Sequence, residues 1–248
     1  MKTVKRLLFL ATGLLMSTSL FHSCLDNDDN YDLRYPNALV TAKTASDQTF
    51  YLQLDEKTTL LPVNIKKSPY GGKEVRALVN YSGVQGDAAP YNQLVHINWI
   101  DSILTKKMVP NRFADNDRIY GNDPVEIVND CVTVAEDGYL TLRFRTLWGS
   151  RLMTPHTVNL LVNNKGGNPY ELEFRHNANG DYADYTGDAL VAFNLKDLPD
   201  TNGETVKIKL KWNSFRGPKS AEFNYKTGEP VQGKLIQGNE HNFKHTVN

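Results

Sequence analysis

The sequence predicts an all-β protein, with a small five-stranded OB-type barrel followed by an antiparallel β-sandwich. Apolar residues recur with the period of two that half-buried strands show, as in "TFYLQLD" and "TVKIKLKWN", whereas helical periodicity is almost absent. The turn-forming stretches "EDG" and "DTNGE" precede such runs and place glycine where a positive φ costs little. Because each run has one apolar and one polar face, we expect antiparallel sheets with one face in water.

The first element, residues 1–23, is predicted to be a lipoprotein signal peptide. Lys2, Lys5 and Arg6 give it a positive start, and residues 7–21 carry no charge. Their most apolar part has the length of a signal-peptide hydrophobic region and is shorter than the roughly 20 residues that a membrane-spanning helix needs. We therefore expect a protein that is exported from the cytoplasm.

Cys24 is the predicted lipidation site. Ser23 precedes it directly, which resembles the bacterial lipobox, in which the cysteine thiol receives a diacylglycerol and becomes the first residue after cleavage. Phe21 and His22 depart from the usual lipobox residues, so a plain signal peptide with an incidental cysteine is the alternative. Each buried methylene of a lipid contributes about 0.8 kcal/mol, so several acyl chains would tether the protein to a membrane.

Residues 24–36 are expected to be an acidic flexible tether. The stretch "LDNDDNYD" has too few apolar groups to offset the entropy cost of ordering it. Acidic residues after the lipidated cysteine also resemble the export signal of Bacteroidetes surface lipoproteins. This predicts an outer membrane lipoprotein, surface-exposed or periplasm-facing, whose N-terminal lipid anchor binds the membrane.

The net charge disfavours nucleic-acid binding, and the cysteine content excludes a disulfide within the folded part. Removal of residues 1–23 leaves 28 − 3 = 25 basic against 28 acidic residues, a formal charge of −3, so no positive field would gather nucleic acid. Cys131 is then the only cysteine besides Cys24, which leaves no disulfide within the folded part. Cys131 lies in "DCVTV", which reads as a strand, and we expect a small buried hydrophobe there.

The OB-type barrel is predicted over residues 37–106. Alternation places Phe50, Leu52 and Leu54 on one face of their strand. Closure of a short sheet into a barrel removes its exposed edges, which favours this arrangement. The strand candidates lie near 38–45, 49–54, 58–63, 74–82 and 93–100.

Residues 107–121 are polar and rich in turn-forming residues, so we expect a linker there, between two separately folded domains. Residues 122–248 are predicted to form the β-sandwich, because seven strands at this spacing are typical of that fold. In its most regular strand, Ile208, Leu210 and Trp212 point one way and lysines point the other. The strand candidates lie near 125–134, 138–147, 156–163, 170–176, 189–195, 205–212 and 221–226.

Several stretches resemble the NigD-like lipoproteins of Bacteroidetes: "INWIDSILTKKMV", "GNDPVEIVNDCVTVAEDGYLTLRF", "LEFRHNANGDYADY" and "ALVAFNLKDL". The resemblance covers essentially the whole chain after the signal peptide. It implies an N-terminal OB-type barrel and a C-terminal β-sandwich. The family name comes from a bacteriocin gene cluster, which implies a link to bacteriocin production or immunity. The resemblance supplies no catalytic residue.

The histidines give no metal or catalytic motif. His96, His156 and His176 lie on or beside predicted strands, and His176 is expected to anchor a turn through its ring nitrogens. His241 and His245 are spaced as neighbours on a helix face, but "HNFKH" lacks the glutamate of a zinc protease motif. Nucleophile elbows, phosphate-binding loops, Rossmann glycines and C-x-x-C pairs are also missing from the sequence, so we expect no cofactor.

Two acidic loops contain part of the residue pattern of calcium-binding loops. "DNDRIYGND" begins with Asp115 and Asp117, but Ile119 cannot serve as the next ligand. "NANGDYADYTGD" begins at Asn177, and it lacks the glutamate that completes an EF-hand. A hydrogen-bonded turn is expected in the second loop, with binding of a hard cation as the alternative.

The function predicted from the sequence is that of a non-enzymatic, lipid-anchored cell-envelope protein that binds another protein or a glycan. A protective role resembling bacteriocin immunity is its specific form. One alternative is an envelope hydrolase that acts on glycans through acidic residues, such as any near Asp181 or Asp184. A second is a structural accessory of a larger outer-membrane assembly.

Overall fold

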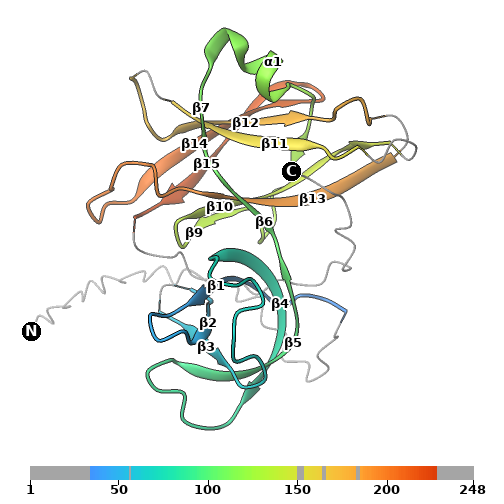
Figure 1. Cartoon of the computed structure of the whole chain (residues 1–248). Coiled ribbons are helices and arrows are strands. Elements are labelled where there is room, and N and C mark those ends of the chain that lie inside the picture. Colours follow the sequence, from blue (N-terminus) through green and yellow to red (C-terminus); the bar gives the residue numbers. More distant parts are fainter. Residues whose placement is uncertain (1–33, 56, 150–153, 164–165, 183–184, 228–248) are drawn as a thin grey trace, which may run out of the picture.

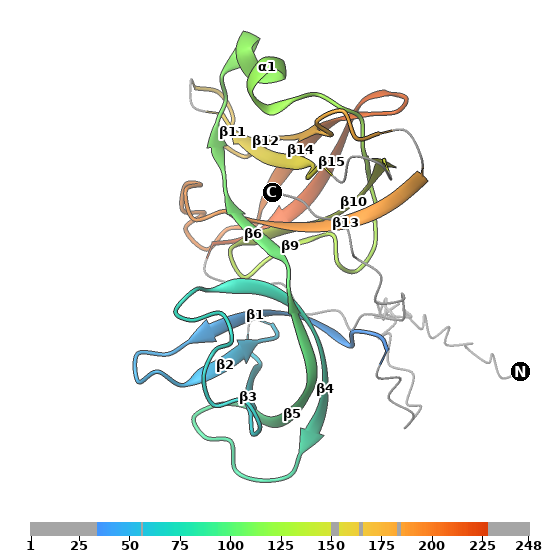
Figure 2. The same cartoon turned by 45° about the vertical axis from the view of Figure 1, so that its right-hand side comes forward.

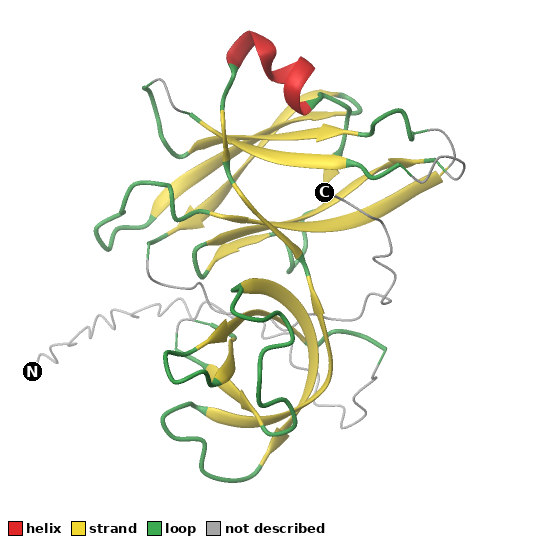
Figure 3. Ribbon diagram, viewed as in Figure 1, coloured by secondary structure: helices red, strands yellow, loops and turns green. Residues whose placement is uncertain are grey.

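A computed structural model describes residues 34–55, 57–149, 154–163, 166–182 and 185–227. It consists of a closed barrel and a two-sheet sandwich (Figures 1 and 3), which confirms the all-β class and the order of the two folds. Cys24, Asp184, His241 and His245 lie outside the described residues. Within the described part of the chain, no helix is both long and apolar enough to cross a membrane.

The barrel contains the five predicted strands. They are β1 (Ala38–Thr44), β2 (Phe50–Gln53), β3 (Thr59–Pro62), β4 (Val75–Val84) and β5 (Gln93–Ser102). Their order around the barrel is β1-β2-β3-β5-β4, and β3 and β5 run parallel. The expected alternation is confirmed, because Phe50 and Leu52 are buried in the barrel core while Leu54 packs at its edge.

The sandwich stacks two sheets. One contains β6 (Leu104–Lys107), β13 (Tyr185–Asn194), β10 (Tyr139–Trp148) and β8 (Glu126–Ile127), with β9 (Val134–Glu136) also beside β10. The other contains β15 (Gly217–Tyr225), β14 (Val206–Ser214), β12 (Glu171–Asn177), β11 (Thr157–Val162) and β7 (Val109–Pro110). The facing apolar sides of the two sheets form one core, which includes Leu142, Phe144, Phe174 and Leu210.

The segment expected as a linker contains regular structure. It holds β7, a 3-10 helix (Phe113–Asp115) and α1 (Asn116–Tyr120), which lies above the second sheet in Figure 1. Just before it, β6 pairs in parallel with β13, whereas β7 pairs in parallel with β11 in the opposite sheet. The chain therefore runs along one edge of the sandwich from sheet to sheet.

The strand expected over 125–134 is replaced by two short strands, β8 and β9, with bends between them. The prediction that Cys131 lies on a strand is wrong, since it lies among the bends and is half-buried. Asp130 explains the break. Its Oδ1 accepts the backbone N–H groups of Val132 at 3.0 Å and Thr133 at 3.2 Å, so the side chain satisfies donors that a ladder would otherwise use.

The barrel lies next to the sandwich (Figure 2), and the two share a buried interface. Its apolar part combines Leu39, Leu78 and Ile103 with Val132, Leu190 and Ala192. Arg76 is 1% exposed and donates to Thr41 Oγ1 at 2.8 Å, to Thr141 Oγ1 at 3.3 Å and to Glu136. Burial raises the pKa of Glu136, and the Arg76 charge opposes that rise. The interface therefore combines packed side chains with a buried ion pair.

Candidate functional site

Two histidines meet inside one end of the sandwich. His156 precedes β11 and His176 lies on β12, and their side chains are 0% and 1% exposed. Nδ1 of His156 is 2.9 Å from Nε2 of His176. The Trp148 indole stacks on the His156 ring with 3.9 Å between centroids, so the pair is held between packed surfaces.

The pair is the centre of a chain of three polar contacts that ends on a backbone carbonyl at each side. His156 Nε2 is 2.8 Å from the Asp181 carbonyl oxygen, and His176 Nδ1 is 3.3 Å from the Asp123 carbonyl oxygen. Each of the three contacts joins two atoms that both carry lone pairs, so each needs one proton to become a hydrogen bond. Two neutral imidazoles supply only two protons, and one contact must lack a proton. The longest contact is the best place for the missing proton. Nε2–H of His156 then donates to Asp181, and Nε2–H of His176 donates to His156.

Burial keeps both rings neutral at pH 7. Burial lowers the pKa of His156, although contacts with Asp181 oppose this shift. Burial, reinforced by the neighbouring His156, lowers the pKa of His176 to about 4. The Asp181 carboxylate oxygen Oδ2 lies 3.7 Å from His156 Nε2, close enough to stabilise a charged form at lower pH.

A pocket of about 170 Å³ opens beside this pair. Side chains on its rim are unusually exposed for apolar residues: Tyr182 is 55%, Phe215 44% and Leu147 37% exposed. Both sheets, the β14–β15 turn and the loop after α1 contribute to it. The lining residues are Asp123, Pro124, Thr146, Leu147, His176, Ala178, Tyr182 and Phe215.

The loop after α1 is held in place by hydrogen bonds to both sheets. Asp123 donates its N–H to the His176 carbonyl at 2.9 Å, and its Oδ2 accepts from the Ala178 N–H at 2.8 Å. Thr146 Oγ1 donates to the Pro124 carbonyl at 2.9 Å from the first sheet. The loop thus closes the edge between the sheets and presents the Asp123 carboxylate in a fixed orientation.

Gly121 allows this loop to approach β12. Its φ is +77°, and a Cβ atom there would lie 2.5 Å from Asn177 Cβ and 2.7 Å from the His176 carbonyl oxygen. Only glycine combines that backbone conformation with so close an approach. The residue therefore determines how near the Asp123 loop lies to the histidine pair.

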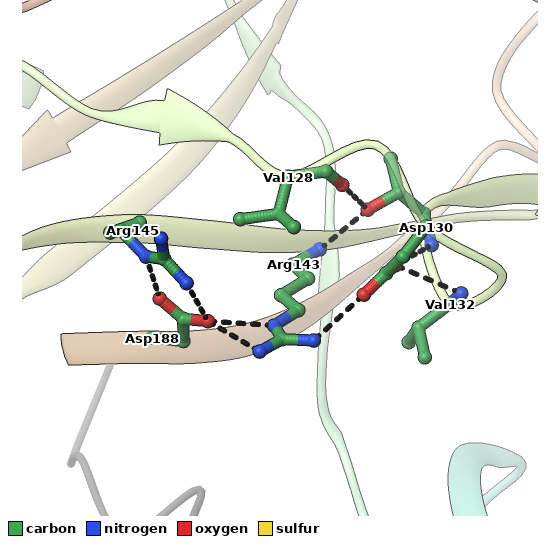
Figure 4. A network of polar contacts seen from close by, with 7 residues as sticks. Val128, Asp130, Val132, Arg143, Arg145 and Asp188 are labelled. Atoms are coloured by element: carbon green, nitrogen blue, oxygen red, sulfur yellow. Dashed lines mark hydrogen bonds and ion pairs between the residues drawn. The ribbon is translucent and has the colours of Figure 1, made fainter. Parts of the chain in front are cut away.

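A second cluster of charges lies on the outer side of β10 and β13 (Figure 4). Arg143 bridges Asp130 at 2.8 Å and Asp188 at 2.6 Å, and Arg145 also binds Asp188 at 2.6 Å. Burial alone would raise the pKa of Asp188, but hydrogen bonds from Arg145 and Arg143 outweigh it and hold the pKa below its usual value. This carboxylate stays ionised, and the network fastens the β8–β9 connection to the sheet.

The remaining sequence candidates are distributed over the molecule. Asp115 pairs with Arg118 at 2.9 Å and Asp117 pairs with Arg175 at 2.5 Å, so the first acidic loop is tied up in ion pairs. In the second, Asn177 Oδ1 accepts the Asn179 N–H at 2.8 Å, which makes the expected hydrogen-bonded turn. The described residues bring together no group of three potential metal ligands.

The contact between His156 and His176 is not predicted by the sequence. His96 is exposed on β5, whereas His156 and His176 are buried. Alternation after Leu172 and Phe174 assigns His176 to the core face, which was the available signal. The expectation that His176 anchors a turn through its ring nitrogens stays a prediction, because the proton assignment above leaves its 3.3 Å contact with the Asp123 carbonyl without a proton. The pairing with His156 depends on a contact that no local pattern reveals.

The chain is similar to solved structures from Parabacteroides and Bacteroides species. A toxin-related protein of Parabacteroides distasonis is 37% identical, with a TM-score of 0.66 and coverage of 77% of this chain and 92% of that chain. A protein of unknown function from Bacteroides vulgatus is 24% identical, with a TM-score of 0.65 and coverage of 86% and 99%. A NigD-like immunity protein from Bacteroides caccae is 19% identical, with a TM-score of 0.55 and coverage of 78% and 99%. The last two show the fold alone.

Family models cover both halves of the fold. The NigD-like N-terminal OB domain matches residues 39–103, and the NigD-like C-terminal beta sandwich domain matches residues 107–225. The search of curated proteins gave no match. The matched ranges include the barrel, the histidine pair and the pocket, and the chain therefore belongs to the NigD-like family.

Proposed function

We propose that this protein is a lipid-anchored component of the cell envelope that binds another protein in an immunity-like, protective role, without catalysing a reaction. The names of the toxin-related and immunity-related structures support the role. The predicted lipobox at Cys24 supports the anchor, and the acidic residues that follow it support a position at the outer membrane.

The observation that carries the binding proposal is the exposed rim of the pocket. Tyr182, Phe215 and Leu147 surround a small opening at the end of the sandwich. Aromatic side chains of this kind are frequent anchors of protein interfaces. A pocket of about 170 Å³ is smaller than the roughly 300–1,000 Å³ of small-molecule sites, so it suits one side chain of a protein partner better than a free ligand.

The geometry favours binding over hydrolysis. The chain of contacts from Asp181 through both histidines reaches the Asp123 carbonyl, where a nucleophilic relay would need a hydroxyl or thiol. In the Arg143 network, Asp188 is held ionised and cannot act as the general acid of a glycosidase pair. Neither cluster has the arrangement that the alternative envelope hydrolase requires.

The binding proposal is tested by photo-crosslinking in the native envelope. A photoreactive phenylalanine analogue at position 215 should capture a discrete partner. The same analogue at His96, which is exposed on the barrel, serves as the control. Identical products from both positions, or none from position 215, would contradict the proposal.

Protection is the functional readout. Cells that carry the Phe215→Ala and Tyr182→Ala double variant should become sensitive to toxin-producing neighbours, while cells with His96→Ala remain protected. Full protection by the double variant would exclude the pocket rim as the binding surface.

Anchoring is tested separately. Intact-mass measurement of the native protein should show added acyl mass on Cys24 and no residues before it. Cys24→Ala should release the protein from the membrane or leave an uncleaved precursor. Cleavage at another position would remove the basis for the lipid anchor.

A further inference from the structure

We propose that the pocket between Tyr182 and Phe215 accepts the side chain of a single lysine or arginine from the partner protein. This inference rests on the proposed function, because it specifies the chemistry by which the same pocket recognises its partner. Three properties of the pocket support it: the shape of its walls, the sign of its charge and the kind of polar atoms around it.

The walls suit a long side chain with an apolar stem. Tyr182 and Phe215 are exposed rings at the mouth, and Leu147 and Pro124 add aliphatic surface. Lysine and arginine bury their methylene stems along such surfaces. Their cationic ends are also attracted to the faces of aromatic rings within about 6 Å.

The charge of the pocket favours a cation. Eight described residues line the pocket, and among them Asp123 is the only aspartate, glutamate, lysine or arginine. The other titratable residues in the lining are His176 and Tyr182. His176 is neutral at pH 7, because burial lowers its pKa to about 4. The Ala178 N–H occupies one oxygen of the Asp123 carboxylate at 2.8 Å, which fixes the carboxylate without neutralising it.

Asp123 and His176 bring acceptor atoms to the lining of the pocket. In the proton assignment above, His176 Nδ1 faces the Asp123 carbonyl at 3.3 Å without a proton between them. A lysine ammonium brings three donors and an arginine guanidinium five, whereas a carboxylate or phosphate would bring further acceptors. The Asp123 carboxylate, which attracts a basic side chain, therefore repels an acidic one.

The experiment compares two small probes that differ in charge. The chain from Cys24 to Asn248, labelled with ¹⁵N, is titrated with N-acetyl-lysine methylamide and with N-acetyl-norleucine methylamide, which has a similar stem without the ammonium group. The amide signals of Ala178 and Phe215 report on the pocket. We expect the lysine probe to bind about fivefold more tightly, the scale of one cation–π contact or exposed ion pair.

Two variants assign that preference to Asp123. Asp123→Asn keeps an oxygen for the Ala178 N–H but removes the charge, so the preference for lysine should fall to what the aromatic rings alone provide. Asp87→Asn is the matched control, because Asp87 accepts the Ala89 N–H at 2.9 Å in a barrel loop in the same way. This control should keep the preference unchanged.

The outcomes separate this inference from the proposed function. If norleucine or an N-acetyl-glutamate probe binds as well as lysine in the unmodified chain, the cationic specificity is wrong, even if crosslinking at position 215 still captures a partner. If lysine binds preferentially but Asp123→Asn has no effect, the assignment to this pocket is wrong. If crosslinking at position 215 fails, the proposed function is contradicted whatever the probes show.

Discussion

His176 shows how one buried titratable residue couples the site to pH. Its unfolded pKa is close to 6.5 and its folded pKa is about 4, because burial opposes the charged ring. Between these values the unfolded chain binds more protons than the folded chain. The stabilising contribution of the neutral ring is therefore complete above about pH 6.5 and declines as the pH falls toward 4.

The free energy of unfolding should accordingly fall by about 2 kcal/mol between pH 7.5 and pH 5 through His176 alone. Urea unfolding at the two pH values measures this change. His176→Gln should reduce the pH dependence, although it also weakens the fold at pH 7.5. His96→Gln is the control, because this histidine is exposed on the barrel, and it should leave the dependence intact. An unchanged dependence in His176→Gln would refute the assignment.

Substitution of Gly121 tests how closely the Asp123 loop packs against β12. Gly121→Ala places a Cβ 2.5 Å from Asn177 Cβ, so the Asp123 loop must move away from β12. Gly138→Ala is matched in φ, which is +76° against +77°, but a Cβ there would have no heavy atom within 4 Å. The control should lose about 1–2 kcal/mol of unfolding free energy, and Gly121→Ala should lose more. Equal losses would show that the loop adapts.

At the scale of elements, the sequence predicted the barrel strands and the main sandwich strands but not β6 and β7. Alternation identifies strands that have one wet and one buried face, as in "TVKIKLKWN". β6 and β7 are short, and each pairs in parallel with a strand far along the chain, β13 or β11. Parallel pairing of this kind leaves no local signal. The sequence therefore placed most of β6 in the predicted barrel, residues 37–106, and β7 in the predicted linker, residues 107–121.

The contribution of these two strands is measurable by truncation. A fragment that begins at Leu104 retains β6 and β7, whereas a fragment that begins at Asn122 lacks both. We expect the longer fragment to give dispersed amide resonances and the shorter one to be markedly less stable. Equal unfolding free energies would mean that β6 and β7 add little to the sandwich.

At the scale of the whole molecule, the barrel contacts the sandwich through the face of β4 that points away from the barrel core. Alternation in the sequence predicts that this face is exposed to solvent. Ala77 and Val79 point into the barrel core, so alternation assigns Arg76 and Leu78 to its outside. Both are nevertheless buried, because the sandwich covers them, and Thr141 on the sandwich side is 0% exposed. The sequence cannot predict this burial, since the covering surface belongs to another domain.

The Arg76–Glu136 pair should couple the unfolding of the two domains. Arg76→Met leaves Glu136 buried without its cation, which typically costs about 3–5 kcal/mol. Calorimetry should show one transition for the unmodified chain and a lower midpoint for the variant. The double variant Arg76→Met with Glu136→Leu should recover much of the loss, because it removes both charges. Two separate transitions in the unmodified chain would contradict the coupling.

The passage from β5 to β6 through Ile103 has a mechanical consequence. If the N-terminus is fixed to a membrane while the sandwich binds a partner, tension between them is carried by the interface of the two domains and by this passage, where the chain leaves the barrel. The pull acts along β6, and the register pairs Leu104 to Lys107 with Val191 to Asn194. Force along a strand loads these bonds together in shear instead of peeling them apart one by one. The parallel pairing of β6 with β13 thus lets the joint resist a pull along the strand.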